Sequence, residues 1–254
     1  MRPLILISND DGFASKGIHE LIKFLRPVAE IVVVAPDGPR SGSACAMTTQ
    51  VPVGCRRLRQ DVGLTIYACS GTPTDCIKLG LHALVPRRPD MVVAGINHGD
   101  NSSVNVHYSG TMGAVFEGCL KGIPSVGFSL CSHLPDADFS HCRGVIVRVV
   151  EEVLRRGLPP WTCLNVNFPD VAELKGVRIC RQTAALWGNE WMPICHRAGS
   201  DYYWMQGEMQ ELDADDPETD HWALNHGYAA ITPTTADLTA HDLLQAMRRE
   251  WNFM

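Results

Sequence analysis

The sequence predicts an α/β protein with a doubly wound, mostly parallel sheet and a C-terminal extension or arm rich in β-structure. Short apolar runs, typical of strands buried on both faces, alternate with amphipathic helical segments over the first 170 residues. Such alternation forms βαβ units, which build parallel sheets with right-handed connections. The alternation stops near residue 170, and the sequence contains no internal repeat. We therefore expect a single domain over residues 1–254.

The first part of the chain supplies three predicted strands and two predicted helices. Apolar side chains recur with helical spacing over residues 16–26, and Pro27 closes that helix. A second helix is expected over residues 74–84, with Thr74 as its N-cap. The predicted strands lie at residues 3–7, 30–36 and 64–70.

The middle of the chain continues the pattern with three more strands and two more helices. One helix, over residues 109–122, is capped by Ser109 or Thr111, and another, over residues 143–157, ends at Gly157. The strands lie at residues 90–97, 125–130 and 162–169. Beyond residue 170 we expect short β-prone pieces at 176–182, 201–206 and 227–233, an acidic solvated loop at 207–221, and a final helix at 240–251.

The composition is that of an ordinary globular protein, with 45% apolar and 20% charged residues. The formal net charge of -6 argues against a large binding surface for a nucleic-acid polymer. The sequence shows no signal peptide and no apolar run of the roughly 18 residues that a transmembrane helix needs. Ten cysteines are scattered without a C-x-x-C pair, as expected for free thiols in a reducing compartment. We expect a cytoplasmic protein without a membrane partner.

Polar clusters follow four of the predicted strands at the points where these strands end. The clusters are SNDDG at 8–12, APDGPRSGS at 35–43, CSGTPTD at 69–75 and AGINHGDN at 94–101. The carboxyl ends of parallel strands meet at one edge of a sheet, where ligands bind in this architecture. A single cluster is more often a turn or a helix start. Four clusters on one edge predict a pocket.

The pocket residues offer oxygen atoms as ligands. Asp10 and Asp11 supply carboxylates, Ser41 supplies a hydroxyl, and Asn97 and Asn101 supply carboxamides. Oxygen ligands suit hard cations such as Mg²⁺ or Mn²⁺, and a cation would neutralise the adjacent acids, which otherwise repel each other. The ordinary alternative is an Asn-Asp-Asp-Gly turn at the surface.

Two glycine-containing stretches, at residues 70–75 and 109–111, open predicted helices. Free amides and the positive end of the dipole make a helix N-terminus an anion site. A hard cation beside such an anion site is suited to phosphoryl chemistry. The sequence contains no G-x-G-x-x-G, G-x-x-x-x-G-K-[ST] or G-x-S-x-G motif, so dinucleotide binding, P-loop chemistry and a serine nucleophile are disfavoured.

The polar clusters also resemble those of the SurE nucleotidase family. The resemblance implies a Rossmann-like core, a divalent metal ion and hydrolysis of nucleoside monophosphates. Two segments depart from the family pattern: SKG at 15–17, where a Pro-Gly is usual, and SAC at 43–45, where Ala-Ser-Asn is common. The matching stretches, in the family's order, are SNDDG at 8–12, VVAPDGPRSGS at 33–43, GTPTDC at 71–76, GINHGDN at 95–101, YSGT at 108–111 and ITPTTADLTA at 231–240.

The same resemblance implies roles for individual residues. The family's metal ligands fall on Asp10, Asp11, Ser41 and Asn97. The substrate and phosphate region falls on Asn101, Ser109, Gly110 and Thr111, and we place Asn9 with it. The family forms dimers or tetramers with exchanged C-terminal segments, so we expect a homodimer or homotetramer. Residues 183–227 are the expected oligomerisation arm, because large apolar groups there need a partner surface: Trp187, Trp191, Tyr202, Tyr203 and Trp204.

These observations predict a metal-dependent phosphomonoesterase, and the resemblance implies that it is a 5'-nucleotidase. Its substrates would be nucleoside 5'-monophosphates, with 3'-monophosphates as further candidates, and its products a nucleoside and phosphate. One divalent ion, Mg²⁺ or Mn²⁺, would be held in each subunit, and Asp10 and Asp11 would be the catalytic residues. The alternative is a non-catalytic module that binds a nucleotide or a metal ion.

Overall fold

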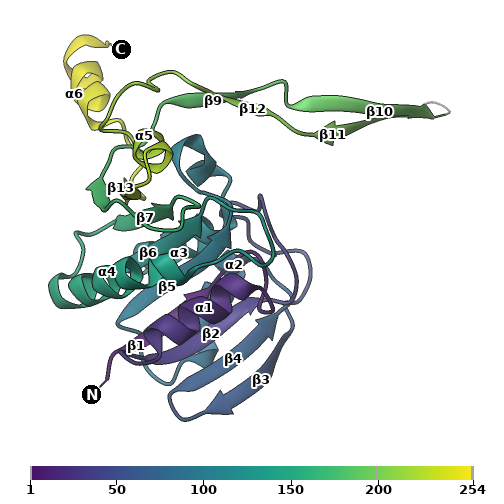
Figure 1. The fold of residues 1–254 in the computed structure, drawn as a ribbon, viewed down its shortest axis with the longest axis vertical. Helices are drawn as coiled ribbons and strands as arrows, with labels where there is room; N and C mark the ends of the chain where they lie inside the picture. Colours follow the sequence, from purple (N-terminus) through teal and green to yellow (C-terminus); the bar gives the residue numbers. More distant parts are fainter. Residues whose placement is uncertain (1, 198–199, 253–254) are drawn as a thin grey trace.

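The computed structural model describes residues 2–197 and 200–252, and over these residues a nine-stranded sheet forms the centre of the protein (Figure 1). In their order across the sheet the strands are β3 (Cys55–Asp61), β4 (Leu64–Cys69), β2 (Glu30–Pro36), β1 (Leu4–Ser8), β5 (Met91–His98), β6 (Ser125–Leu130), β7 (Thr162–Phe168), β13 (Ala229–Thr235) and β8 (Val177–Ile179). The strand order reverses beside β1, as in a doubly wound α/β fold. The predicted fold class is confirmed.

The six strands from β4 to β7 in this order all run parallel to one another. Every residue of β1 and of β6 is buried, as expected for apolar runs that are covered on both faces. β13 is antiparallel to β7, and β3 is antiparallel to β4 at the opposite edge. The six strands predicted before residue 170 are therefore present.

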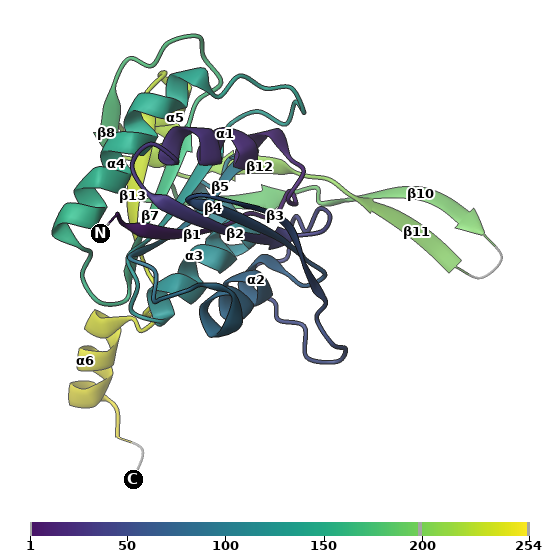
Figure 2. The same ribbon diagram turned by 90° about the horizontal axis from the view of Figure 1, so that it is seen from below.

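Four helices cover the two faces of the sheet (Figure 2). α1 (Lys16–Leu25) and α4 (Arg143–Arg156) lie on one face, and α2 (Pro73–Leu79) and α3 (Gly110–Leu120) lie on the other. The helically spaced apolar residues of α1, such as Ile18 and Leu21, are fully buried, and each contributes about 1.5–3 kcal/mol relative to an exposed side chain. Gly157 ends α4, as predicted.

The second predicted helix differs from its expected bounds. Its N-cap is Thr72, not Thr74: the Thr72 hydroxyl accepts the Asp75 amide at 3.1 Å, and an Asp75 carboxylate oxygen accepts the Thr72 amide at 2.9 Å. This reciprocal capping box satisfies two helix-terminal amides, which Thr74 could not do from inside the first turn. α2 ends at Leu79, and Gly80–Leu84 continue as a π-helical turn.

The edge strand β3 is not predicted by the sequence pattern. All of its residues, CRRLRQD, are exposed, so no apolar alternation marks it as a strand. Backbone pairing with β4 holds this segment in its strand conformation instead. Three arginines on an edge strand also oppose pairing with another chain.

Two of the β-prone pieces beyond residue 170 extend the main sheet as β8 and β13, which are parallel to each other. α5 (Asp220–Asn225) packs beside β13 through the buried Ala223 and Leu224. The acidic segment 207–221, expected to be a loop, contains β12 (Glu208–Glu211) and the start of α5. That expectation is therefore wrong in part, because Thr219 caps α5 and pairing orders β12.

Between β8 and α5 the chain forms a long two-part hairpin that projects from the body (Figures 1 and 2). We call residues 185–211 the arm. Its root pairs β9 (Ala185–Gly188) with β12, and its outer part pairs β10 (Trp191–Arg197) with β11 (Ser200–Met205), both antiparallel. The outer part carries exposed large side chains: Trp191, Met192, Ile194, Tyr202, Tyr203, Trp204 and Met205.

The last predicted helix is present as α6 (His241–Glu250), which follows β13 and has no buried residue. Figure 1 shows it standing away from the sheet. None of the helices that the structure describes is long and apolar enough to cross a membrane. The cysteines whose side chains are described are free thiols.

Candidate functional site

Asp10 follows β1 and is only 4% exposed. Its Oδ1 accepts the Thr111 hydroxyl at 2.5 Å, and its backbone carbonyl accepts the Arg40 amide at 2.7 Å. Burial raises the pKa of Asp10 to about 6, with a smaller contribution from the Asp11 charge, although the Thr111 hydrogen bond lowers it. A positive charge beside Asp10 would lower this pKa and favour the ionised form.

Asp11 lies beside the end of β5, because its Oδ2 accepts the His98 amide at 3.1 Å. Burial raises the pKa of Asp11, while the His98 hydrogen bond and the charges of His98 and His133 lower it. The structure thus places the two predicted acids at the carboxyl edge of the sheet, between the ends of neighbouring strands.

A break in the β5–β6 register between Ala94 and Asn97 brings the chain into the site. Gly95 permits this break: its φ is +119°, and a Cβ there would lie 2.2 Å from the Phe128 carbonyl oxygen. Asn97, 8% exposed, donates its Nδ2 to the Gly99 carbonyl at 2.7 Å. This bond orients the carboxamide, whose Oδ1 is the atom that could bind a cation.

The loop after β2 carries Ser41 and Ser43 past Asp10, since the neighbouring Arg40 amide bonds the Asp10 carbonyl. Ser41 is exposed. The Oγ of Ser43 is buried and has no hydrogen-bond partner among the residues that the structure describes. The structure therefore brings Ser41 to the neighbourhood of the acid pair, and its role as a ligand stays a prediction.

The first turn of α3 lies directly against Asp10. Of the two predicted N-caps, Ser109 and Thr111, the structure shows Ser109. Its hydroxyl accepts the Met112 amide at 3.0 Å. A Cβ on Gly110 would lie 2.8 Å from the Asp10 Cβ and 2.5 Å from the Ser43 Oγ, so glycine is what permits this approach. A helix N-terminus, which favours anions, thus stands beside the predicted cation site.

Thr111 contacts Asp10 rather than standing free for a ligand. Its hydroxyl donates a hydrogen bond to the Asp10 Oδ1. The sequence assigns Thr111 to the phosphate region, and the structure gives it a further role, because it fixes the orientation of an acid in the pair. At the start of α3, the Gly110 amide is therefore a better candidate than the Thr111 hydroxyl for binding an anion.

Asn9 is fully buried beside Asp10 in the chain. Its Nδ2 donates to the Gly12 carbonyl and to the Ser15 Oγ, both at 2.9 Å, whereas its Oδ1 is buried and finds no partner within residues 2–197 and 200–252. An unpaired buried polar atom costs about 1–3 kcal/mol, so the Asn9 Oδ1 and the Ser43 Oγ are suited to contact a bound polar group.

Asn101 is held by polar residues of the sheet that the sequence analysis missed. Its amide donates to the Asn167 Oδ1 at 2.8 Å, its Nδ2 donates to the Ser129 Oγ at 2.8 Å, and its carbonyl accepts the Asn165 Nδ2 at 2.7 Å. A signal was present: the two asparagines alternate within the strand TCLNVNF, so they share one face. These bonds fix the loop after β5 against β6 and β7.

The fold and these contacts define an α/β protein in which oxygen-bearing side chains gather at the carboxyl edge of the sheet, beside the N-terminus of α3. The family model for survival protein SurE matches residues 5–189, which is most of the chain. The protein belongs to the SurE family.

Relatives of known name cover nearly the whole chain. The 5'-nucleotidase SurE of Phocaeicola vulgatus is 57% identical over 251 residues, which cover 99% of this chain and 97% of that protein. The 5'-nucleotidase SurE of Bacteroides fragilis is 58% identical over 247 residues, 97% of each chain. The crystal structure of the SurE protein from Aquifex aeolicus is similar with a TM-score of 0.83 at 34% identity, and covers 97% of this chain and 99% of that one.

Proposed function

We propose that this protein is a metal-dependent 5'-nucleotidase that hydrolyses nucleoside 5'-monophosphates, with 3'-monophosphates as a second substrate class. One observation carries the proposal: in a chain of the SurE family, Asp10 lies against the start of α3 and the adjacent Asp11 lies beside the end of β5. The full-length similarity to proteins named 5'-nucleotidase SurE supports nucleotidase activity.

The residues fit one hard divalent cation per subunit, Mg²⁺ or Mn²⁺. Asp10, Asp11, Ser41 and Asn97 would hold it through oxygen atoms only. The raised pKa values of both acids support a cation here, since its charge would offset the cost of burying two carboxylates. When bound, the metal ion supplies positive charge that polarises the phosphoryl group.

The other requirements of hydrolysis fall to the protein's own groups. The Gly110 amide and the positive end of the α3 dipole would bind the phosphate and stabilise the negative charge that develops on it. Asn9 and Asn101 would contact the substrate from the loops after β1 and β5, and Thr111 would keep Asp10 oriented. One of Asp10 and Asp11 would take the proton of the attacking water.

The decisive assay measures phosphate release from a panel of nucleoside 5'- and 3'-monophosphates, with and without a chelator. We expect release that chelation abolishes and that Mg²⁺ or Mn²⁺ restores. The alternative, a non-catalytic module, would bind a nucleotide in calorimetry without releasing phosphate. Equal turnover in chelated and metal-loaded protein would contradict the metal requirement, and no turnover of any nucleotide would contradict the nucleotidase.

We also propose that the arm joins copies of this chain into a homodimer or homotetramer. Trp191, Tyr202 and Trp204 on its outer part are 58%, 54% and 64% exposed, and apolar groups of this size on an extension usually need a partner surface. α6, which has no buried residue, is a second candidate for such a contact.

Light scattering at micromolar concentration tests whether the arm mediates oligomerisation. We expect a dimer or tetramer for the unmodified protein and a shift to smaller species for the double variant Trp191→Ser, Trp204→Ser, because these changes remove apolar contact area. Val62→Ser is the matched control, since Val62 is 97% exposed on the turn after β3, far from the arm in sequence. A purely monomeric unmodified protein would refute the proposal.

A further inference from the structure

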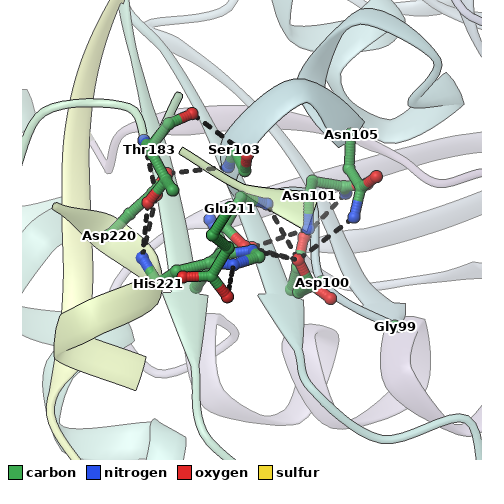
Figure 3. Close-up of polar contacts among 12 residues, drawn as sticks. Gly99, Asp100, Asn101, Ser103, Asn105, Thr183, Glu211, Asp220 and His221 are labelled. Carbon is green, nitrogen blue, oxygen red and sulfur yellow. Dashed lines mark hydrogen bonds and ion pairs between the residues drawn. The ribbon is translucent and has the colours of Figure 1, made fainter. Parts of the chain in front are cut away.

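A charged cluster outside the acid pair joins the root of the arm to the loop that carries Asn101 (Figure 3). His221, in the first turn of α5, lies at its centre with a side chain that is 15% exposed. Its Nδ1 lies 3.0 Å from the Glu211 Oε1, and its Nε2 lies 3.8 Å from the Asp100 Oδ2. An imidazole that faces a carboxylate at each nitrogen is best satisfied when both nitrogens carry protons.

The surroundings keep His221 charged. Burial opposes the charge most strongly, but the attraction of Asp100, the hydrogen bond to Glu211 and the charge of Asp220 outweigh it and raise the pKa of His221 to about 9. The 3.8 Å separation from Asp100 is longer than a hydrogen bond, so charge attraction dominates on that side. Although burial opposes ionisation of Asp100, its contacts with His221 and Ser102 lower its pKa.

Asp100 organises the loop that follows β5. Its Oδ2 accepts the Ser102 amide at 3.2 Å, the Ser102 hydroxyl, and the Asn105 Nδ2 at 3.3 Å. The Asn105 Oδ1 in turn accepts the Trp187 Nε1 of β9 at 3.1 Å. The loop therefore contacts both strands at the root of the arm: β9 through Trp187, and β12 through His221 and Glu211.

Asp220, the fully buried neighbour of His221, ties the same loop to the start of the arm. Its Oδ1 accepts the Thr183 hydroxyl at 2.6 Å and the Thr183 amide at 3.0 Å, and its Oδ2 accepts the Ser103 amide at 2.9 Å. The Ser103 hydroxyl donates to the Thr183 carbonyl at 3.0 Å. Two adjacent residues of α5 thus connect both ends of the arm to residues 100–105.

We propose that His221 is a positioning residue of the nucleotidase site: held between Asp100 and Glu211, it sets the 100–105 loop, and with it Asn101, relative to the arm. This inference rests on the proposed function, because Asn101 is a predicted substrate-binding residue. The sheet holds Asn101 on one side, and the His221 cluster holds the loop on the other. Loss of His221 therefore weakens substrate binding more than it slows the chemical step.

Steady-state kinetics on His221 variants provides the first test. We expect His221→Ala to raise KM about tenfold while kcat stays within about twofold, the pattern of lost binding rather than lost chemistry. His221→Arg keeps a positive charge with several donors and should restore most of the affinity. His226→Ala is the matched control, because His226 is exposed at the end of the same helix. An unchanged KM in a folded His221→Ala protein would overturn the proposal.

The pH dependence of KM shows whether the charge of His221, rather than the shape of its side chain, positions the loop. His221 has a pKa raised above its ordinary 6.5 to about 9, so its attraction to Asp100 and Glu211 is complete below pH 6.5 and is lost as pH rises through about 9. The carboxyl groups that face His221 are those of Asp100, Glu211 and Asp220. We expect KM to rise above pH 9 in the unmodified protein and not in His221→Arg. The same rise in both would overturn the proposal.

Amide hydrogen exchange measures how well the 100–105 loop is ordered and does not require enzymatic turnover. Amides of residues 100–105 should exchange about tenfold faster in His221→Ala, and near the unmodified rate in His221→Arg and in His221→Gln, which retains a hydrogen-bonding side chain. Equal exchange in His221→Ala and unmodified protein would refute the positioning role. Faster exchange in a protein that releases no phosphate from any nucleotide would support the positioning role and refute only the proposed function.

Discussion

Asparagine in place of Asp11 is expected to lower kcat/KM for nucleoside monophosphate hydrolysis by about a thousandfold, which corresponds to about 4 kcal/mol of lost transition-state stabilisation. Asparagine matches aspartate in size and keeps an oxygen that can accept the His98 amide, so the local fold is preserved. It removes the negative charge that would hold a divalent ion. Phosphate release over a Mg²⁺ titration measures the loss, and Asp61→Asn on the exposed edge strand β3 is the matched control.

Folding stability gives an independent readout of the same acid pair. The folded-state pKa of Asp10, about 6, lies above its ordinary 3.8, so the folded protein binds more protons than the unfolded chain between these values. In chelated protein, stability should therefore fall as pH rises from about 4 to about 6, and Mg²⁺ should reverse the fall.

Unimpaired turnover by chelated Asp11→Asn protein would contradict the assignment of this pair to a metal ion.

The parallel core could be predicted because each of its elements carries a local signal. β1 and β2 each contain a run of at least four consecutive apolar residues, and the apolar side chains of α1 repeat with helical spacing. β3 and α5 lack such a signal. β3 is exposed along its whole length, and α5 is a short helix that begins within an acidic segment. Pairing with β4 and packing beside β13 order these two elements, and neither contact is visible in a local pattern.

The position of the site could be predicted for a similar reason, and the partners of its atoms could not. Parallel topology brings the ends of β1 and β5 to one edge, so Asp10, Asp11 and Asn97 gather wherever those strands pair. The Thr111 hydroxyl, however, bonds a carboxylate 101 positions away along the chain. Similarly, His221 at the start of α5 contacts Asp100 in the loop after β5 and Glu211 in β12, and these residues lie in separate segments of the chain. Such contacts depend on tertiary geometry, which a single sequence does not encode in its spacing.

Alanine in place of Gly110 is expected to lower kcat/KM by about a hundredfold, because the first turn of α3 and the acid pair leave no room for a methyl group. The new Cβ would lie 2.5 Å from the Ser43 Oγ and 2.8 Å from the Asp10 Cβ, so the helix start or Asp10 must move. Either movement separates the Gly110 amide from the predicted metal site. The overpacking should also lower the free energy of unfolding by about 1–3 kcal/mol.

Gly144→Ala is the matched control, since Gly144 lies in the first turn of α4 and a Cβ there meets nothing within 4 Å. Alanine should raise stability there by about 0.5–1 kcal/mol through helix propensity and leave turnover unchanged. The inhibition constant of inorganic phosphate identifies the cause in Gly110→Ala, because a displaced anion site binds phosphate more weakly. Unmodified phosphate affinity together with full activity in Gly110→Ala would show that the start of α3 does not serve as the phosphate site.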